Sequence, residues 1–368
     1  MKPLKLFNWP YVIQKEILGF MDLQSIFLLS LCSKRMNSLI VSVERARFKK
    51  IQYIHCHIED SITINAFMFD GSSDLIIQLL YPIAVKCSGT LTISGFDVHY
   101  GYIPTLQSES FALLYRYYFE NKEYYARTDT LLESIQDHSD ELFGNEKEYR
   151  LVLGASNIDY RLPKLRNVTS SNIYVDPTID AKTVDDFCSA SPHMEFLRIG
   201  NYIRSRLEEN SNIYWIKTLD IKENSSMIVP GILHKFTGRQ AFMWTSKVDN
   251  SDIIQFLNRW KSNAAFQNLE VLTIHSRNDS HPTDLIEIRN SVGVKELNNE
   301  NNEHEYHYKR RINSKTDVLS LKKFDAFSYL VREYDNRVAS VVIEKDMFLF
   351  GVWDLTEEEF LEKFTKAE

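Results

Sequence analysis

The 368 residues include only four cysteines, and these are Cys32, Cys56, Cys87 and Cys188. They lie far apart in the chain, and no two form a Cys-x-x-Cys pair. Four scattered cysteines are too few for a disulfide framework and lack the spacing of a structural zinc site. We therefore expect isolated, buried thiols in a reducing compartment.

The sequence also lacks a long apolar run. The most apolar window, from Ile17 to Cys32, is interrupted by Asp22 and Gln24 and is too short to span a bilayer. The basic first residues are not followed by the apolar core and small-residue cleavage site of a targeting segment. These absences predict an intracellular protein of the cytoplasm and/or nucleus that does not act at a membrane.

Positive charge is not in excess, because the formal net charge is −7. A general nucleic-acid-binding protein normally presents a basic face, so no nucleic-acid partner is expected. The hydrophobic content of 44% and the charged content of 25% are typical of a globular protein, and the length suffices for two or three domains.

Motifs of catalysis are missing as well. There is no glycine-rich phosphate loop and no Gly-x-Ser-x-Gly elbow. The run His55-Cys56-His57 places two imidazoles on one side of a strand, but a zinc ion needs three or four ligands and no third is identifiable. His304 and His307 lie in a polar segment where no preorganised site is expected. We predict no catalytic residue, cofactor or metal.

The first fifty residues contain a pattern of short helices. Pro10 suits the first turn of a helix, in which Ile13, Ile17 and Met21 recur every four residues. Asp22 then serves as the N-cap of a second helix.

The second helix is apolar on both faces, and Ser33 can cap a third helix from Lys34 to about Lys50. Three such helices have more apolar surface than they can bury among themselves. The surplus is covered either by a partner protein or by the rest of the chain, and physical reasoning alone leaves both possibilities open.

Residues Trp9 to Ile40 resemble the F-box, a family pattern with Leu-Pro, an Ile-Leu pair, Leu-Asp and an apolar helix ending in Val-Ser-Lys/Arg-x-Trp. The ungapped matches are Pro10, Ile17, Leu18, Met21, Asp22, Ile26, Leu29, Leu31, Ser33, Lys34 and Arg35. Trp9, Leu23 and Met36 replace the usual Leu, Pro and Trp, and each exchange keeps an apolar side chain.

This resemblance implies that the helices dock on the Skp adaptor protein, which links them to a cullin–RING ubiquitin ligase. We expect the centre of this helix-in-groove interface at six residues, Pro10, Ile13, Ile17, Leu18, Leu28 and Leu31. Any of them can instead pack only inside the helical module. Two alternatives remain open: a Skp-bound protein that never joins a cullin, and an enzyme with a fused protein-binding module.

Beyond the predicted helices, residues 51–167 are expected to form a mixed α/β spacer, with strands at Ile51–Ile54, Leu91–Ile93 and Tyr149–Leu153 and a helical stretch at Phe111–Tyr118. From about Val168 a short strand pattern repeats roughly 22 to 30 residues apart, a spacing typical of leucine-rich solenoids. Its copies are Asn172–Val175, Met194–Ile199, Ile216–Ile221, Ala241–Trp244 and Leu269–Ile274. Helices are expected between these strands, at Val184–Ser189, Met227–Phe236 and Asp252–Asn263. Strands that alternate with helices predict a parallel sheet with the helices on one side.

The stretch Asp252 to Trp260, followed by Leu269-Glu270-Val271-Leu272, also resembles the F-box-associated domain expanded in nematodes (type 2). Gln255 replaces the usual Asn of that pattern. Phe256, Leu257 and Trp260 are interpreted as the core face of a helix, and Arg337–Ile343 and Phe348–Trp353 as closing strands. Asn298 to Arg311 is expected to be a solvated polar loop.

The predicted fold class is therefore α+β or α/β. It comprises a three-helix F-box (1–50), the spacer (51–167) and an irregular leucine-rich-like domain with closing C-terminal strands (168–368). The predicted function is a non-catalytic substrate adaptor of a Skp–cullin–F-box ubiquitin ligase. Its target protein and substrate-binding residues cannot be identified from the sequence.

Overall fold

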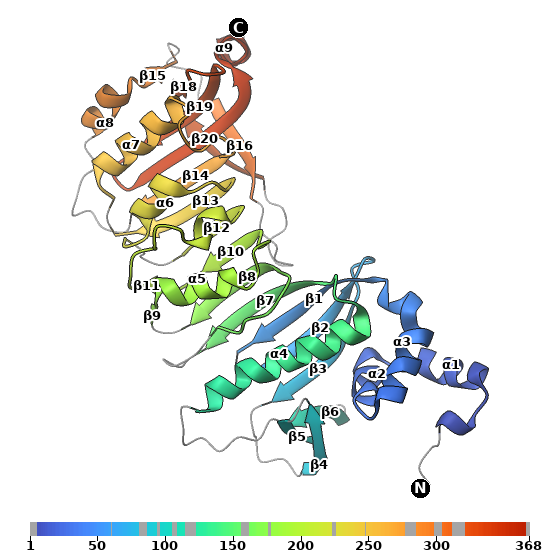
Figure 1. Ribbon diagram of the computed structural model, residues 1–368. Helices are drawn as coiled ribbons and strands as arrows, with labels where there is room; N and C mark the ends of the chain where they lie inside the picture. Colours follow the sequence, from blue (N-terminus) through green and yellow to red (C-terminus); the bar gives the residue numbers. More distant parts are fainter. Residues whose placement is uncertain are drawn as a thin grey trace. The chain divides into compact units, whose positions relative to one another are not determined.

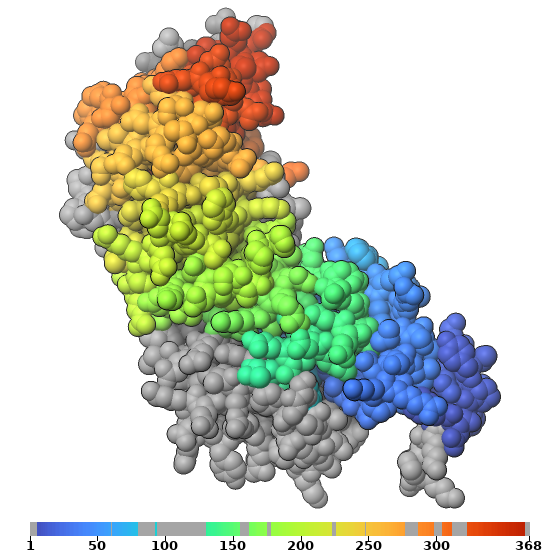
Figure 2. Space-filling model, in the orientation of Figure 1, coloured from blue at the N-terminus to red at the C-terminus, as the bar shows by residue number. Residues whose placement is uncertain are grey.

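The chain folds into two compact units, Met1–Ser171 and Asn172–Glu368 (Figures 1 and 2). The computed structural model describes residues 6–59, 61–80, 87–93, 96–104, 109–114, 123–155, 162–175, 178–222, 226–246, 248–276, 285–297, 304–310 and 321–365. No helix within these segments is both long and apolar enough to cross a membrane.

The first unit begins with helices and continues as a mixed sheet. Its elements are η1 (Leu6–Asn8), α1 (Tyr11–Gly19), α2 (Leu23–Ser30), α3 (Lys34–Phe48), β1 (Ile51–Ile58), β2 (Ser61–Met68), β3 (Ser73–Leu80), β4 (Cys87–Ile93), β5 (Phe96–Pro104), β6 (Glu109–Leu114), α4 (Glu123–Phe143) and β7 (Glu148–Ala155). The strands lie in the order β7-β1-β2-β3-β6-β5-β4. β7 with β1 and β3 with β6 pair in parallel, and the other pairs are antiparallel.

Helix α4 covers one face of this sheet. Side chains alternate between the two faces of a strand, so Ile54 and Cys56 of β1 point to the same face and both are buried. Leu131 and Ile135, one turn apart on α4, are also buried. Figure 1 shows α4 lying across β7, β1 and β2. The apolar stripe of the helix and the apolar face of the sheet form the core of the first unit.

The second unit starts within strand β8 (Val168–Val175). It continues with β9 (Thr178–Ile179), α5 (Ala181–Ser189), β10 (Phe196–Ile199), β11 (Tyr202–Ile203), η2 (Asn212–Trp215), β12 (Thr218–Ile221), α6 (Val229–Lys235), β13 (Gln240–Thr245), α7 (Asn250–Lys261), β14 (Val271–Ser276), α8 (Leu285–Val292), β15 (Lys295–Glu296), β16 (His304–Lys309), β17 (Leu321–Ala326), β18 (Ser328–Val331), β19 (Arg337–Ile343), β20 (Met347–Thr356) and α9 (Glu357–Thr365). Its main sheet has the order β8-β10-β12-β13-β14-β20-β19-β18-β15.

The repeating strand pattern forms the parallel half of this sheet, because β10, β12, β13 and β14 pair in parallel. Helices α5, α6 and α7 lie on one face of these strands, and their side chains form the lime to gold surface in Figure 2. Phe256 and Trp260 of α7 are fully buried against Phe350 of β20, at ring-centroid distances of 5.1 Å each. The predicted core face of this helix is thereby confirmed.

The opposite face of the sheet is partly covered by the β16–β17 hairpin. The ring of Tyr306 lies so close to Gly351 of β20 that a Cβ there would be 2.4 Å from it. The Tyr306 hydroxyl contacts the backbone oxygens of Glu270 and Val352, at 2.8 and 2.9 Å. Only glycine leaves room for this ring, which fixes the hairpin on the strands.

Two predictions are wrong. Phe111–Leu114 belongs to strand β6 rather than to a helix, because pairing with β5 overrides the helical preference of its Ala and Leu residues. Residues 304–309 of the predicted polar loop form β16, whose charged side chains alternate with buried ones. The remaining residues of these two stretches, 115–118, 298–303 and 311, lie outside the described residues. Helix α4 was not predicted at all.

The first residue of β16, His304, is fully buried beside the C-terminal helix. Its ring packs against Phe360 and Phe364 of α9, at centroid distances of 5.1 and 5.2 Å. Its Nε2 lies 2.9 Å from Ser340 Oγ, and no described residue pairs with its Nδ1. Burial lowers the pKa of His304 to about 4 because this site does not solvate an imidazolium.

His304 should make the stability of the chain depend on pH. Below about pH 6.5 an unfolded histidine binds a proton, whereas folded His304 stays neutral down to about pH 4. Stability therefore falls as pH decreases through this window. We expect His304 to account for a loss of about 1 kcal/mol between pH 7.5 and 5.5.

The measurement is denaturant unfolding of the natural chain and of His304→Gln at both pH values. The glutamine variant should show a smaller loss, whatever its absolute stability. Equal losses in the two proteins would contradict the assignment to His304.

Candidate functional site

Two of the three N-terminal helices, α2 and α3, begin where capping side chains satisfy free backbone N–H groups. The Asp22 carboxylate accepts a hydrogen bond of 2.6 Å from the N–H of Ser25 at the start of α2. The Ser33 hydroxyl accepts one of 3.2 Å from Met36 at the start of α3. Both predicted caps are confirmed, and they set the two turns of the helical module formed by residues 6–48.

The helical module is held against the rest of the first unit by aromatic contacts. Phe27 of α2 meets the ring of His138 on α4 edge-on at 5.1 Å, and Phe48 of α3 meets Phe143 at 5.0 Å. Ser30 Oγ lies 2.6 Å from His138 Nε2. Burial lowers the pKa of His138, which favours the neutral ring in this contact. One face each of α2 and α3 is therefore covered by the chain itself.

An arginine joins the first turn of the module to the sheet. Arg47 of α3 donates a hydrogen bond of 2.6 Å to the carbonyl of Met21, and its other nitrogen lies 3.3 Å from the Asp74 carboxylate of β3. The turn between α1 and α2 is thus held from α3. Because this turn follows α1, the contact also helps to hold α1 in place.

Helix α1 exposes a group of large apolar side chains, which we call the α1 face. Phe20 is 86% exposed and Val12 65% exposed. The α1 face comprises Trp9, Tyr11, Val12, Ile13 and Phe20. Ile13 and Phe20 are seven residues apart and share one side of the helix with Ile17, four residues after Ile13. Five large exposed apolar side chains on and beside one short helix are consistent with a surface for a protein partner.

The six predicted docking residues fall into three groups. Pro10 and Ile13 are exposed, Ile17 and the α2-end residues Leu28 and Leu31 are half-buried, and Leu18 is fully buried. Ile13 and Ile17 share one side of α1, whereas Leu28 and Leu31 lie together at the end of α2. Leu18 packs inside the module and can affect docking only by holding α1 in place.

Four residues of the α1 face, Trp9, Tyr11, Val12 and Phe20, were not among the predicted docking residues. The sequence could have indicated these residues as docking candidates, because they are large apolar residues beside Pro10 and at the end of α1. Gln14 of α1 is buried, and its amide donates a hydrogen bond of 2.7 Å to the Trp9 carbonyl. A polar side chain thus occupies an inward position of α1, and apolar ones point outward.

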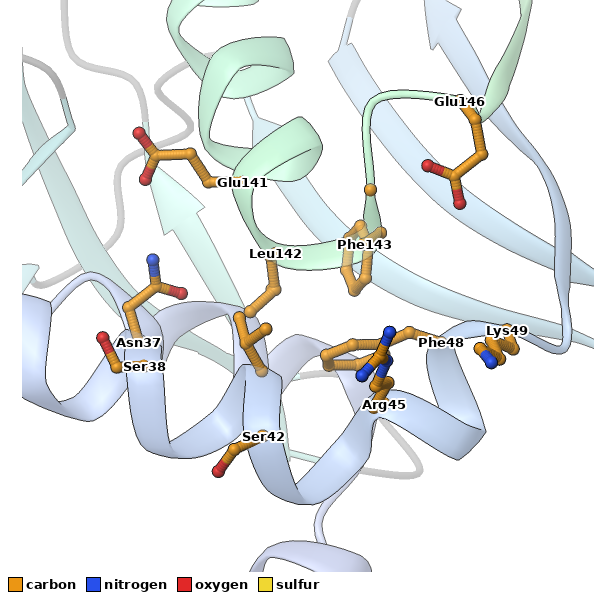
Figure 3. A pocket seen from close by; sticks show the side chains of 12 residues that line it. Asn37, Ser38, Ser42, Arg45, Phe48, Lys49, Glu141, Leu142, Phe143 and Glu146 are labelled. Atoms are coloured by element: carbon orange, nitrogen blue, oxygen red, sulfur yellow. The ribbon is translucent and has the colours of Figure 1, made fainter.

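A cavity of about 720 Å³ lies between α3 and the end of α4 (Figure 3). Phe48 and Phe143 lie together at its wall, while Arg45 and Glu146 line its polar part. Ser38 and Ser42 also line it, but their hydroxyls donate to carbonyls of their own helix. Both hydroxyls are thus engaged within α3.

The His55-Cys56-His57 run does not converge on one point. Cys56 is buried, and burial raises the pKa of its thiol to about 12. His57, on the other face of β1, lies 3.1 Å from Glu59. Of the other cysteines with described side chains, Cys188 is buried and Cys32 is exposed, contrary to the expectation of a buried thiol. Within the described residues no three His, Cys, Asp or Glu side chains are grouped to hold a metal ion.

Comparison with known proteins identifies the helical module. No curated protein and no solved structure matches the chain. A family model, the F-box domain, matches residues 6–48. This range begins with η1 and ends with α3, so the matched residues and the structural module coincide. Residues 6–48 therefore carry an F-box domain, as their resemblance predicted.

Proposed function

We propose that this chain is the substrate-recognition subunit of a Skp–cullin–F-box ubiquitin ligase. The F-box domain at residues 6–48 supports the proposal, because F-box domains bind the Skp adaptor. The observation that carries it is the α1 face, which the chain itself leaves exposed. An amphipathic helix with such a face fits an apolar groove on a partner.

In this proposal Pro10, Ile13, Ile17, Leu28 and Leu31 contact the adaptor directly, together with the α1 face. Leu18 contributes by packing beneath α1. The chain supplies no catalytic group. It acts by proximity, raising the effective concentration of target lysines near the charged conjugating enzyme. Such a subunit works inside the cell, in the cytoplasm and/or nucleus.

The second unit is proposed to bind the target protein. Its parallel strands with helices on one face, followed by β19 and β20, support a leucine-rich-like arrangement. The α7–β14 segment resembles the nematode F-box-associated domain, which follows the F-box in the same order along the chain. A domain of this kind can present a broad sheet face to another protein.

Replacing Ile13 by Glu should weaken adaptor binding without unfolding the module. Ile13 is 39% exposed and lies in the first turn of α1, where an acidic side chain suits the helix dipole. Truncating a central interface residue costs about 2 kcal/mol, or about 30-fold in affinity. Titration calorimetry with the purified Skp adaptor measures the change.

The matched control is Phe69→Glu, which changes a side chain of the same unit that is 70% exposed but lies outside the module. It should bind the adaptor like the natural chain. An Ile13→Glu variant that is folded and binds with unchanged affinity would rule out the α1 face as the docking surface.

Truncating Leu18 and truncating Val12 should have different effects on the free energy of unfolding, although both are apolar residues of α1. Leu18→Ala removes a fully buried side chain and should lower the free energy of unfolding by about 2 to 5 kcal/mol. Val12→Ala, at an exposed position, should change it by less than about 0.5 kcal/mol. Urea denaturation of the chain without adaptor tests both. Equal stabilities would show that Leu18 is not a core residue.

Co-purification distinguishes the ligase from an adaptor-bound protein that acts alone. Tagged natural chain should recover both the Skp adaptor and a cullin, and Ile13→Glu should recover less of both. Recovery of the adaptor without any cullin, under conditions in which a known cullin complex is recovered intact, would favour the second possibility.

A further inference from the structure

The cavity between α3 and the end of α4 runs along one face of α3 (Figure 3). Asn37, Val41, Arg45 and Lys49 line it at intervals of four residues, which places them on one side of the helix. The helix face from Asn37 to Lys49 is about 18 Å long. With a volume of about 720 Å³, the cavity is of the size that commonly binds ligands. We call this cavity the α3 groove.

The inner wall of the α3 groove is apolar. Phe48 of α3 and Phe143 of α4 pack edge-on with ring centroids 5.0 Å apart, and both are buried. Leu142 is also buried and lines the groove beside them. An apolar side chain of a ligand that lies against this wall leaves water, which favours binding.

Charged side chains form the rim of the groove. Arg45 and Lys49 are exposed on one wall, one turn apart at the end of α3. Glu141, in the last turn of α4, and Glu146, in the loop after it, are exposed on the other wall. Among the described residues, the side chains of Arg45 and Lys49 make no ion pair or hydrogen bond. Both cations are therefore available to a ligand.

The two signs of charge are separated along the groove. In Figure 3 Glu141 lies at the end formed by the first turns of α3. Arg45 and Lys49 lie toward the other end, together with Glu146. The carboxylate of Glu146 also lies 3.7 Å from Lys147, so it does not neutralise both cations. One end of the groove is thus negative and the other is positive, and the two ends are about 15 Å apart along α3.

We propose that the α3 groove binds an extended protein segment with a basic side chain near Glu141 and an acidic side chain facing Arg45 and Lys49. An apolar side chain between them would lie on the inner wall. The inference goes beyond the proposed function, which assigns target binding to the second unit. Charge complementarity selects this partner, since each end of the groove attracts the opposite sign. A nucleic acid is a poorer fit, because carboxylates line the groove as well as cations.

The length of the groove determines the spacing of charges in the segment. Four steps of an extended chain span about 13 Å, so the basic and acidic residues should be four positions apart. Alternate side chains of an extended chain point to the same side, which places the apolar residue midway between them. The simplest probe is therefore Lys-Ala-Leu-Ala-Glu, the mixed peptide.

The test uses the full chain and amidated peptides whose N-terminus carries a neutral dye on a short glycine linker. Fluorescence anisotropy should detect binding of the mixed peptide that weakens as salt increases from about 50 to about 300 mM. Glu-Ala-Leu-Ala-Glu and Lys-Ala-Leu-Ala-Lys each bring a like charge to one end of the groove and should bind about fivefold more weakly. No binding of the mixed peptide, or equal binding of all three, overturns the proposal.

Glu141→Lys should produce a change of preference that a merely structural role would not. Lysine suits the last turn of a helix, so α4 should remain folded. Both ends of the groove become positive in this variant. It should therefore bind the acidic peptide more tightly than the mixed one, which reverses the order of the natural chain. An unchanged order would contradict the proposed position of the basic side chain.

Two exposed lysines of the first unit provide matched variants. Lys49 lines the groove, whereas Lys164 does not. Lys49→Glu should weaken binding of the mixed peptide about fivefold, because it converts an attraction into a repulsion. Lys164→Glu makes the same change of charge and should have less than about a twofold effect. Equal effects of the two variants would place the peptide outside the groove.

The Skp adaptor must be distinguished from the peptide as the occupant, because most of the α3 face belongs to the F-box domain. The mixed peptide should bind the free chain and the chain–adaptor complex with affinities that agree within about twofold. Ile13→Glu should leave the peptide affinity unchanged. Displacement of the peptide by the adaptor would assign the groove to the adaptor and overturn the inference. Unweakened adaptor binding by Ile13→Glu would refute only the α1 face as the docking surface and leave the peptide result standing.

Discussion

The packing of Phe27 and Phe48 against α4 decides which apolar side chains of the helical module are left outside. These contacts direct the buried faces of α2 and α3 toward the sheet of the first unit. Helix α1 packs on α3, and its Leu18 is fully buried within the module. The exposure of the α1 face follows from this arrangement, so the module binds the rest of the chain on one side and has an apolar surface free on the other.

The two faces of the main sheet in the second unit also differ in what covers them. Successive side chains of a strand point to opposite faces of the sheet. Phe350 belongs to the row that meets α7, whereas Asp220 and Phe242 belong to the opposite row. The helices complete the core on the first side. On the second side the β16–β17 hairpin provides cover, and Arg310, the residue after β16, lies 2.9 Å from Asp220. The ion pair between Arg310 and Asp220 thus depends on the hairpin being anchored by Tyr306.

Local patterns in the sequence predicted the caps, the helical module and the parallel strands, because each depends on neighbouring residues. Asp22 and Ser33 act on backbone groups three residues away, and the apolar residues of β12 repeat those of β10. Contacts between distant residues were harder to foresee. The alternation of β16 is hidden among charged residues and becomes clear only through pairing with β17, and β6 is a strand because β5 lies beside it.

The candidate sites, too, could be predicted from the sequence only where they depend on neighbouring residues. The F-box pattern located the helical module but could not separate Leu18, which is fully buried, from Ile13, which is exposed. The ion pairs of Asp220 with Arg198 and Arg310 were not predicted, because their members come from β10, β12 and a hairpin residue about ninety positions after Asp220. Only the folded sheet brings Arg198 and Arg310 to one carboxylate.

The partly buried hydrogen bond from Gln14 to the Trp9 carbonyl affects the rate of partner binding and its entropic cost. It ties the segment before α1 to the helix, so Trp9 and Pro10 do not have to be ordered when a partner arrives. A partner would therefore meet a preformed surface and lose less conformational entropy on binding. Association with such a surface is governed by diffusion and orientation rather than by folding of the entry segment.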